Sequence, residues 1–144
     1  SGAQVLVHVA GAARQTVTRF SNGKMRVSPE PLSITQMAAQ CDLALCHGGA
    51  GTTAAMLLAG KPLVLLPMHM EQIMTAQRLA SLGAAVGVTP DATAQLTRLL
   101  RKALADATLS AAARRFAQTH AGYDQQASIT AAAACCESLL TAPR

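Results

Sequence analysis

Asp42-Leu-Ala-Leu-Cys-His47-Gly-Gly-Ala-Gly-Thr-Thr53 is the stretch that decides the fold. Its run Leu43–Cys46 is short, apolar and bounded by a charge and glycines, which is typical of a parallel strand buried on both faces. Three glycines in four residues then allow a sharp turn, for which we expect a left-handed backbone at Gly51. A helix is predicted to begin at Thr52, where the glycines end. The stretch therefore predicts a strand, a tight loop and a helix in succession.

The start of this predicted helix is a candidate anion site. The first N–H groups of a helix have no partner inside it, and the helix dipole places partial positive charge at the same end. His47 stands directly before the glycines, and it is a hydrogen-bond donor that can also carry charge. Phosphate is the ligand that this combination favours.

A second strand and helix follow about twenty residues later. Leu63–Leu66 lies between two prolines, as a strand buried on both faces does, and Glu71-Gln72 opens the helix after it. The pattern predicts further strands at Val5–Val9, Met25–Val27 and Ala85–Val88, and further helices at Ala12–Phe20, Ser33–Gln40, Met70–Leu82, Thr108–His120 and Tyr123–Leu140, with another after Pro90.

Strands that alternate with helices predict a Rossmann-like α/β domain, in which helices flank a parallel sheet. The loops that follow parallel strands emerge at the same edge of the sheet. The glycine turn and Glu71-Gln72 are therefore expected to share one crevice, which is where α/β folds bind their ligands.

Composition limits the function classes. The chain has 144 residues, enough for one domain with a proper core, and a net charge of +5 suits an anionic ligand. With no Trp, one Tyr and two Phe, it offers little on which bases can stack, so nucleic acid is not an expected partner.

Cysteine spacing and hydropathy set further limits. The four cysteines show no C-x-x-C spacing, so we expect free thiols and no metal site. Lys61 and Pro62 interrupt the longest apolar run before it reaches the ~20 residues of a membrane span. We therefore expect no transmembrane segment and a cytoplasmic location.

A dinucleotide site is the main alternative. Gly49-Ala-Gly51-Thr-Thr-Ala54 matches the pattern G-x-G-x-x-G/A, and Glu71 follows at about the right distance. Against this, the motif follows at least the third strand instead of the first, and Glu71 lies beyond the tip of its strand. An NAD(P)-type site therefore ranks second. His8, inside the first predicted strand, is interpreted as a structural histidine with no role in binding.

Three motifs carry a family resemblance. His47-Gly-Gly-Ala-Gly-Thr-Thr53, Leu57-Leu-Ala-Gly-Lys-Pro62 and Glu71-Gln72 closely resemble the nucleotide-sugar-dependent glycosyltransferases of the GT-B fold, in the family that glycosylates natural products, sterols and lipids. The resemblance is specific over residues 42–83 and extends over residues 28–140. It corresponds to the C-terminal, donor-binding domain alone. It implies that residues 1–144 lack the first strand and helix of that domain, and that the N-terminal acceptor-binding domain is absent.

The resemblance implies a role for each matching residue. The donor diphosphate would be held by His47, Gly49, Ala50, Gly51 and Thr52. The sugar hydroxyls would be bound by Glu71 and Gln72, with Glu71 standing where the family usually has Asp. The nucleobase loop falls on Pro31, Ser33 and Ile34, where the aromatic platform of the family is missing.

The implied function is transfer of a sugar, with inversion, from a nucleoside diphosphate, UDP or dTDP, to the hydroxyl of a small-molecule acceptor. The resemblance implies no metal, no cofactor beyond this donor, and a general base in the missing domain, so no catalytic residue is assigned in this chain. We expect the 144 residues alone to bind donor and transfer nothing. A sugar-nucleotide epimerase of the same fold is a further alternative.

Overall fold

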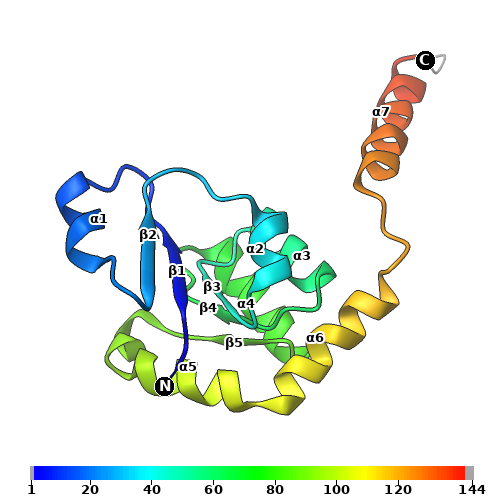
Figure 1. The fold of residues 1–144 in the computed structure, drawn as a ribbon. Helices are drawn as coiled ribbons and strands as arrows, with labels where there is room; N and C mark the ends of the chain where they lie inside the picture. Colours follow the sequence, from blue (N-terminus) through cyan, green and yellow to red (C-terminus); the bar gives the residue numbers. More distant parts are fainter. Residues whose placement is uncertain (1, 142–144) are drawn as a thin grey trace.

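The computed structural model describes residues 2–141 and shows strands and helices in alternation (Figure 1). The strands are β1 (Val5–His8), β2 (Met25–Ser28), β3 (Ala44–Cys46), β4 (Leu63–Leu65) and β5 (Ala85–Gly87). The α-helices are α1 (Arg14–Phe20), α2 (Ile34–Gln40), α3 (Ala50–Leu58), α4 (Met70–Ser81), α5 (Leu96–Ala105), α6 (Ala107–Thr119) and α7 (Gln125–Thr141), and a 3-10 helix, η1 (Pro90–Gln95), precedes α5. The predicted α/β architecture is confirmed.

The strands form two separate parallel sheets instead of the single sheet that we expected. β1 pairs with β2, with Val5 opposite Met25. β4 lies between β3 and β5, with Val64 opposite Leu45 and Val86. Within residues 2–141 no ladder joins the two sheets, which Figure 1 shows as a β1–β2 unit beside the three-stranded one.

The core lies around β4, whose three residues have no exposed surface. On one face of β4, Leu63 and Leu65 belong to a hydrophobic cluster with side chains of α2, α3 and α6. On the other face, Val64 belongs to a second cluster, which includes side chains of α5. The prediction of a strand buried on both faces is therefore confirmed for β4. It is wrong for β3, because that strand is an edge strand and the Leu45 side chain keeps 43% of its surface exposed.

The glycine turn differs from the prediction in one detail. α3 begins at Ala50 with Gly49 as its N-cap, so Gly51 lies in the first helical turn and does not have a positive φ. The left-handed residue is Gly48, with φ of 95°. Any of the three glycines in the Gly-Gly-Ala-Gly run could adopt a left-handed backbone. Because α3 begins earlier than predicted, Gly49 becomes its N-cap and Gly51 lies inside it, which leaves Gly48 as the left-handed residue. At the other end of α3, Gly60 has φ of 70°, the left-handed conformation typical of a residue just past a helix C-terminus.

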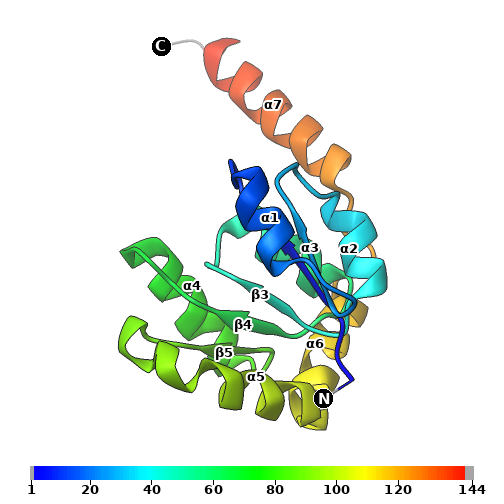
Figure 2. The same cartoon turned by 60° about the vertical axis from the view of Figure 1, so that its left-hand side comes forward.

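The C-terminal part runs along one side of the core and then leaves it. α6 packs against α3, and its N-cap Asp106 accepts hydrogen bonds from the backbone of Thr108 and Leu109. α7 projects away from the rest of the molecule (Figure 2), and its described residues are all exposed. No helix among the described residues is both long enough and apolar enough to span a membrane.

Candidate functional site

A pocket of about 360 Å³ opens where β1 and β3 end. Residues from four parts of the chain line it: the end of β1, the end of β3, the glycine turn with the start of α3, and the first turn of α4. The lining residues are His8, Leu45, Cys46, His47, Gly49, Thr52 and Gln72. The structure thus brings the glycine turn and Gln72 into one crevice, as expected from parallel strands.

The glycine turn is pressed against the first turn of α4. Gly48 is buried, and a β-carbon built on it would lie 3.6 Å from the carbonyl oxygen of Gln72. The left-handed backbone at Gly48 turns the chain from β3 into α3 within three residues, 47–49. This turn places His47 and the N-terminus of α3 at the same pocket.

The N-terminus of α3 presents free backbone donors. Its first intrahelical bond is the one from Thr53 N to Gly49 O, at 3.1 Å. The amides of Ala50, Gly51 and Thr52 therefore have no acceptor inside the helix. No side chain caps them, because the N-cap is a glycine and makes no side-chain cap bond. The Thr53 hydroxyl donates back to Gly49 O at 2.9 Å and so does not compete for these amides.

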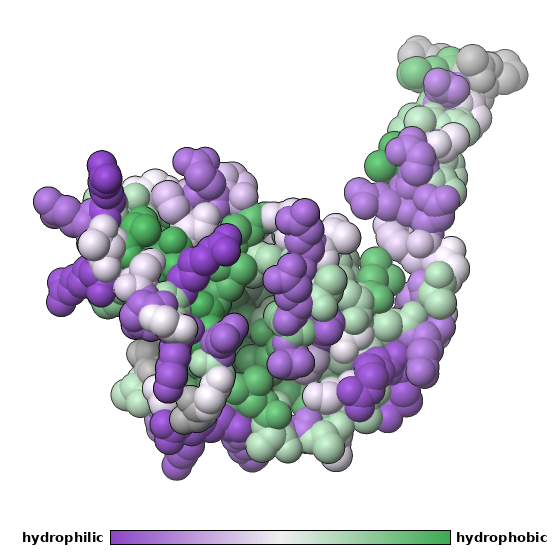
Figure 3. Space-filling view, in the orientation of Figure 1, coloured by the Kyte–Doolittle hydropathy of each residue, from purple (hydrophilic) through white to green (hydrophobic). Residues whose placement is uncertain are grey.

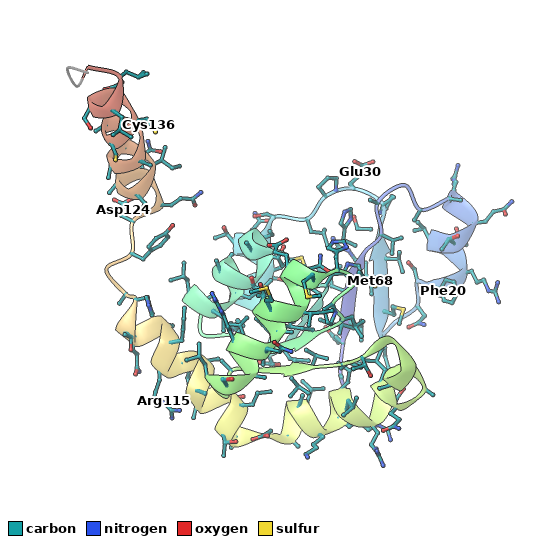
Figure 4. All side chains as sticks on the ribbon, turned by 180° about the vertical axis from the view of Figure 1, so that it is seen from behind. Phe20, Glu30, Met68, Arg115, Asp124 and Cys136 are labelled. Carbon is teal, nitrogen blue, oxygen red and sulfur yellow. The ribbon has the colours of Figure 1, made fainter. Side chains whose placement is uncertain are left out.

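Gln72 shapes the loop between β4 and α4. Its side-chain oxygen Oε1 accepts a hydrogen bond from the backbone N–H of Met68 at 2.8 Å. This bond closes the loop and engages Oε1, so the remaining polar group of this pocket-lining side chain is the Nε2 amide, a hydrogen-bond donor. Figure 4 shows Met68 on that loop, near the middle of the molecule. Glu71 is exposed in the same helical turn and does not line the pocket.

Two histidines from distant parts of the sequence, His8 and His47, line this pocket. His47 is exposed at the end of β3. His8 ends β1, with Nδ1 3.3 Å from the carbonyl oxygen of Ser28. Sequence reasoning gave His8 no role in binding, and the structure adds that it lines the pocket. Its position at the C-terminal end of a parallel strand was the signal that could have found it.

Leu45 and Cys46 add an apolar side chain and a thiol to the lining of the pocket. Burial raises the pKa of the Cys46 thiol, and a hydrogen bond from the Gly48 backbone opposes the shift. The thiol is therefore neutral at pH 7 and acts as a small apolar group beside the exposed Leu45 side chain. Polar donors and an apolar wall within one crevice are typical of a small-molecule site.

The other predicted site residues lie outside the pocket lining. Ala50 and Gly51 are exposed in the first turn of α3 and can contribute only backbone groups. Of the predicted nucleobase residues, Ser33 caps α2 by accepting from Gln36 N at 3.4 Å, Ile34 packs against the core, and Pro31 is exposed in the loop before α2. Their role toward a base stays a prediction.

The residues described by the structure include no group of three metal-ligating side chains. The cysteines are free: Cys41 and Cys46 are partly buried, while Cys135 and Cys136 are exposed on α7.

Known proteins match this chain at the level of family and fold. The family model of the erythromycin biosynthesis protein CIII-like C-terminal domain matches residues 2–135. A sterol 3-beta-glucosyltransferase of Vanderwaltozyma polyspora is 35% identical over 68 residues, which is 47% of this chain and 6% of that protein.

Solved structures agree with this. A spinosyn rhamnosyltransferase, SpnG, complexed with spinosyn aglycone superimposes with a TM-score of 0.74 at 21% identity, covering 90% of this chain and 36% of that one. The glycosyltransferase VinC in complex with dTDP gives a TM-score of 0.69 at 20% identity, covering 81% of this chain and 37% of that one.

The chain spans only 6% of the sterol glucosyltransferase and little more than a third of the two structures. The two superpositions cover 81% and 90% of this chain. The chain belongs to the erythromycin biosynthesis protein CIII-like C-terminal domain family and has the fold of the C-terminal domain of GT-B glycosyltransferases.

Proposed function

We propose that this chain is the donor-binding domain of an inverting glycosyltransferase, which moves a sugar from a nucleoside diphosphate to an acceptor hydroxyl. One observation carries the proposal: the uncapped N-terminus of α3 and the side chain of His47 meet at one pocket beside the ends of two strands. The family and the fold support it. The matching regions of the relatives belong to proteins named as glycosyltransferases.

The diphosphate is the group that this pocket suits best. Negative charge builds on the departing diphosphate as the bond to the sugar breaks, and donors already aimed at that position stabilise it. The free amides of Ala50, Gly51 and Thr52 and the imidazole of His47 supply such donors. His8, at the end of β1, adds a second imidazole to the lining of the pocket.

The sugar is assigned to the first turn of α4. Gln72 lines the pocket, and its Nε2 group can donate to a sugar hydroxyl while Oε1 holds Met68 N. Glu71 precedes it in the same turn and can accept from a hydroxyl. The exposed position of Glu71 favours a contact with a sugar that extends beyond the pocket.

UDP or dTDP is the proposed nucleotide, and the name of one structural neighbour includes dTDP. Pro31, Ser33 and Ile34 are proposed to lie nearest the base, in a site without an aromatic platform. We propose a cytoplasmic location.

A small-molecule acceptor and the general base are assigned to a second domain. The chain spans a little more than a third of its structural neighbours, and none of its pocket residues is a carboxylate. Transfer needs a base within reach of the acceptor hydroxyl and a surface that holds the acceptor in line.

A ligand panel tests the proposal. The purified 144-residue chain is heated with UDP, dTDP, GDP or NAD, all at one concentration that is about a hundredfold above the dissociation constant of the ligand that binds most tightly. A bound nucleotide at this excess adds ~2.7 kcal/mol to stability and raises Tm by roughly 5–10 °C. We expect UDP or dTDP to give the largest shift. A larger shift with NAD would overturn the proposal in favour of the dinucleotide interpretation, and no shift with any ligand would overturn both.

A further inference from the structure

The imidazole of His8 is attached to the end of the β1–β2 ladder. His8 lies opposite Ser28 in that ladder, and its Nδ1 atom is 3.3 Å from the carbonyl oxygen of Ser28. The same oxygen accepts a hydrogen bond from the backbone N–H of Val9 at 3.0 Å, and its two lone pairs serve the two donors. The ring is therefore held in place at the edge of the pocket.

This contact determines the chemical character of the second ring nitrogen. A carbonyl oxygen only accepts, so Nδ1 carries the proton in the hydrogen bond to Ser28. In a neutral imidazole with its proton on Nδ1, the Nε2 atom is an acceptor. Within residues 2–141 the structure gives Nε2 no hydrogen-bond partner, and the side chain is exposed. His8 therefore presents a hydrogen-bond acceptor to a ligand in the pocket.

Other polar groups at this pocket are donors. The first amides of α3 have no acceptor inside the helix, and the Oε1 atom of Gln72 is engaged by Met68 N, which leaves its Nε2 amide. The oxygens of an ionised diphosphate are acceptors, so they satisfy these donors but offer nothing to His8. A ligand that uses both kinds of group carries a hydroxyl close to its phosphates.

The pocket also offers apolar surface. The Leu45 side chain, which is 43% exposed, lines the same pocket as His8. Figure 3 shows hydrophobic surface in the recess between the β1–β2 unit and the remainder of the molecule. Apolar surface disfavours a charged group, which loses its hydration there. A ribose is uncharged and combines C–H groups with two hydroxyls, so it suits apolar surface that is accompanied by an acceptor.

We propose that His8 is a specificity-determining residue whose Nε2 atom accepts a hydrogen bond from a ribose hydroxyl of the donor nucleotide. This role rests on the proposed binding of a nucleoside diphosphate with its phosphates at α3. The ribose is joined to the diphosphate through one methylene group, and a pocket of about 360 Å³ is in the size range of sites for whole small molecules. The transferred sugar lies at the other end of the diphosphate, where Gln72 is assigned to it.

A direct contact between His8 and a phosphate is the competing interpretation. That contact requires a protonated ring, because Nε2 is a donor only in the imidazolium form when Nδ1 keeps its proton for Ser28. His47 differs, since no hydrogen bond within the described residues fixes which of its nitrogens carries the proton. A neutral His47 can therefore donate to a phosphate, whereas a neutral His8 cannot do so without losing its contact with Ser28.

Nucleotides that lack one hydroxyl test the proposal on the unsubstituted chain. Calorimetry compares UDP, 2′-deoxy-UDP and 3′-deoxy-UDP at about pH 8, the upper end of the range in which histidine changes its charge. We expect one of the two deoxy analogues to bind roughly 3- to 10-fold more weakly than UDP, the scale of one neutral hydrogen bond. The analogue that loses affinity identifies the hydroxyl. Equal affinities for all three nucleotides would overturn the proposal.

His8→Phe connects this discrimination to the imidazole, because it keeps an aromatic ring and removes the acceptor. We expect the variant to bind UDP and the weaker analogue with equal affinity, and to bind pyrophosphate, which has no ribose, as tightly as the parent. A variant that still discriminates between the two nucleotides would contradict the role of His8. Equal losses for pyrophosphate and UDP would also contradict it, because His8 would then act on the phosphates. The analogue comparison on the parent decides the question even if this variant does not fold.

His69→Phe is the matched control. His69 is exposed before α4, makes no side-chain cap bond there and is not among the residues that line the pocket. We expect it to leave the affinities for UDP and pyrophosphate unchanged, and a loss of UDP affinity equal to that of His8→Phe would overturn the assignment. A parent chain that binds neither UDP nor pyrophosphate would refute the proposed function itself. Binding of UDP that is indifferent to both ribose hydroxyls would refute only the role of His8.

Discussion

Gly48 and Gly51 lie three residues apart in the same turn, yet alanine should have opposite effects at the two positions. Gly48 has φ of 95°, and a β-carbon there would have ordinary contacts of 3.6 Å or more with Gln72. The cost of Gly48→Ala is therefore conformational and amounts to about 1–2 kcal/mol of unfolding free energy, as expected for a left-handed backbone.

Gly51→Ala should not destabilise the protein. Gly51 lies in the first turn of α3 and has no positive φ, and a β-carbon added there would meet no atom within 4 Å. Alanine in a helix is favoured over glycine by roughly 0.5–1 kcal/mol, with a smaller gain in the first turn. The two variants should therefore differ by ~2 kcal/mol in stability.

Urea denaturation of both variants, analysed at a common m-value, measures this difference. For a chain of this size it corresponds to a gap of roughly 4–8 °C in Tm. Equal stabilities, or a larger loss for Gly51→Ala, would refute the assignment of the left-handed residue to Gly48. The same pair corrects the expectation that Gly51 needs a left-handed conformation.

Four further outcomes are expected. His47→Ala weakens nucleoside diphosphate binding by about 1–3 kcal/mol in calorimetry, the scale of a lost hydrogen bond to a charged group, and unchanged affinity would contradict the phosphate assignment. Gln72→Ala lowers affinity for the intact sugar donor but not for the bare diphosphate. Gln72→Glu is the control, because it retains the acceptor for Met68 N and so removes the amide donor to the sugar without loosening the loop. The hydrogen bond from the Thr108 hydroxyl holds the pKa of Asp106 below its ordinary value of 3.8, so the carboxylate stabilises the fold above that pH and this contribution is lost as pH falls through the lowered pKa. The difference in Tm between the parent and Asp106→Ala should therefore shrink on acidification. A constant difference would disprove the carboxylate cap. The 144-residue chain binds donor and shows no acceptor-dependent sugar transfer in a product assay, and transfer by this chain alone would place the base inside it.

Local signals in the sequence were sufficient for most of the elements. Prolines on both sides of β4 define a short buried strand, and Gly60 and Gly83 end their helices in the left-handed conformation that a C′ residue favours. Ser33 caps α2 as its residue type predicts. These features depend on neighbours in sequence, so the sequence alone determines them.

Features that depend on distant contacts were not predictable in the same way. The composition of the glycine run does not specify which residue takes the positive φ, and the residue that takes it, Gly48, is the one that lies against Gln72 in a distant helix. The hydropathy of β3 resembles that of β4, although one lies at an edge and the other in the centre. For the site, the motif identified His47, Gly49 and Thr52, and parallel topology added Gln72. His8 was missed because a single histidine in a strand belongs to no motif.

Among the described residues, no buried side-chain nitrogen or oxygen lacks a hydrogen-bond partner. The backbone donors at the N-terminus of α3 differ, because no side chain caps them and the helix begins at the pocket that His8 and His47 line. An anion accepts hydrogen bonds from several amides of a helix end at once and also interacts favourably with the helix dipole. A diphosphate bound at α3 would therefore satisfy donors that the side chains of this domain do not cap.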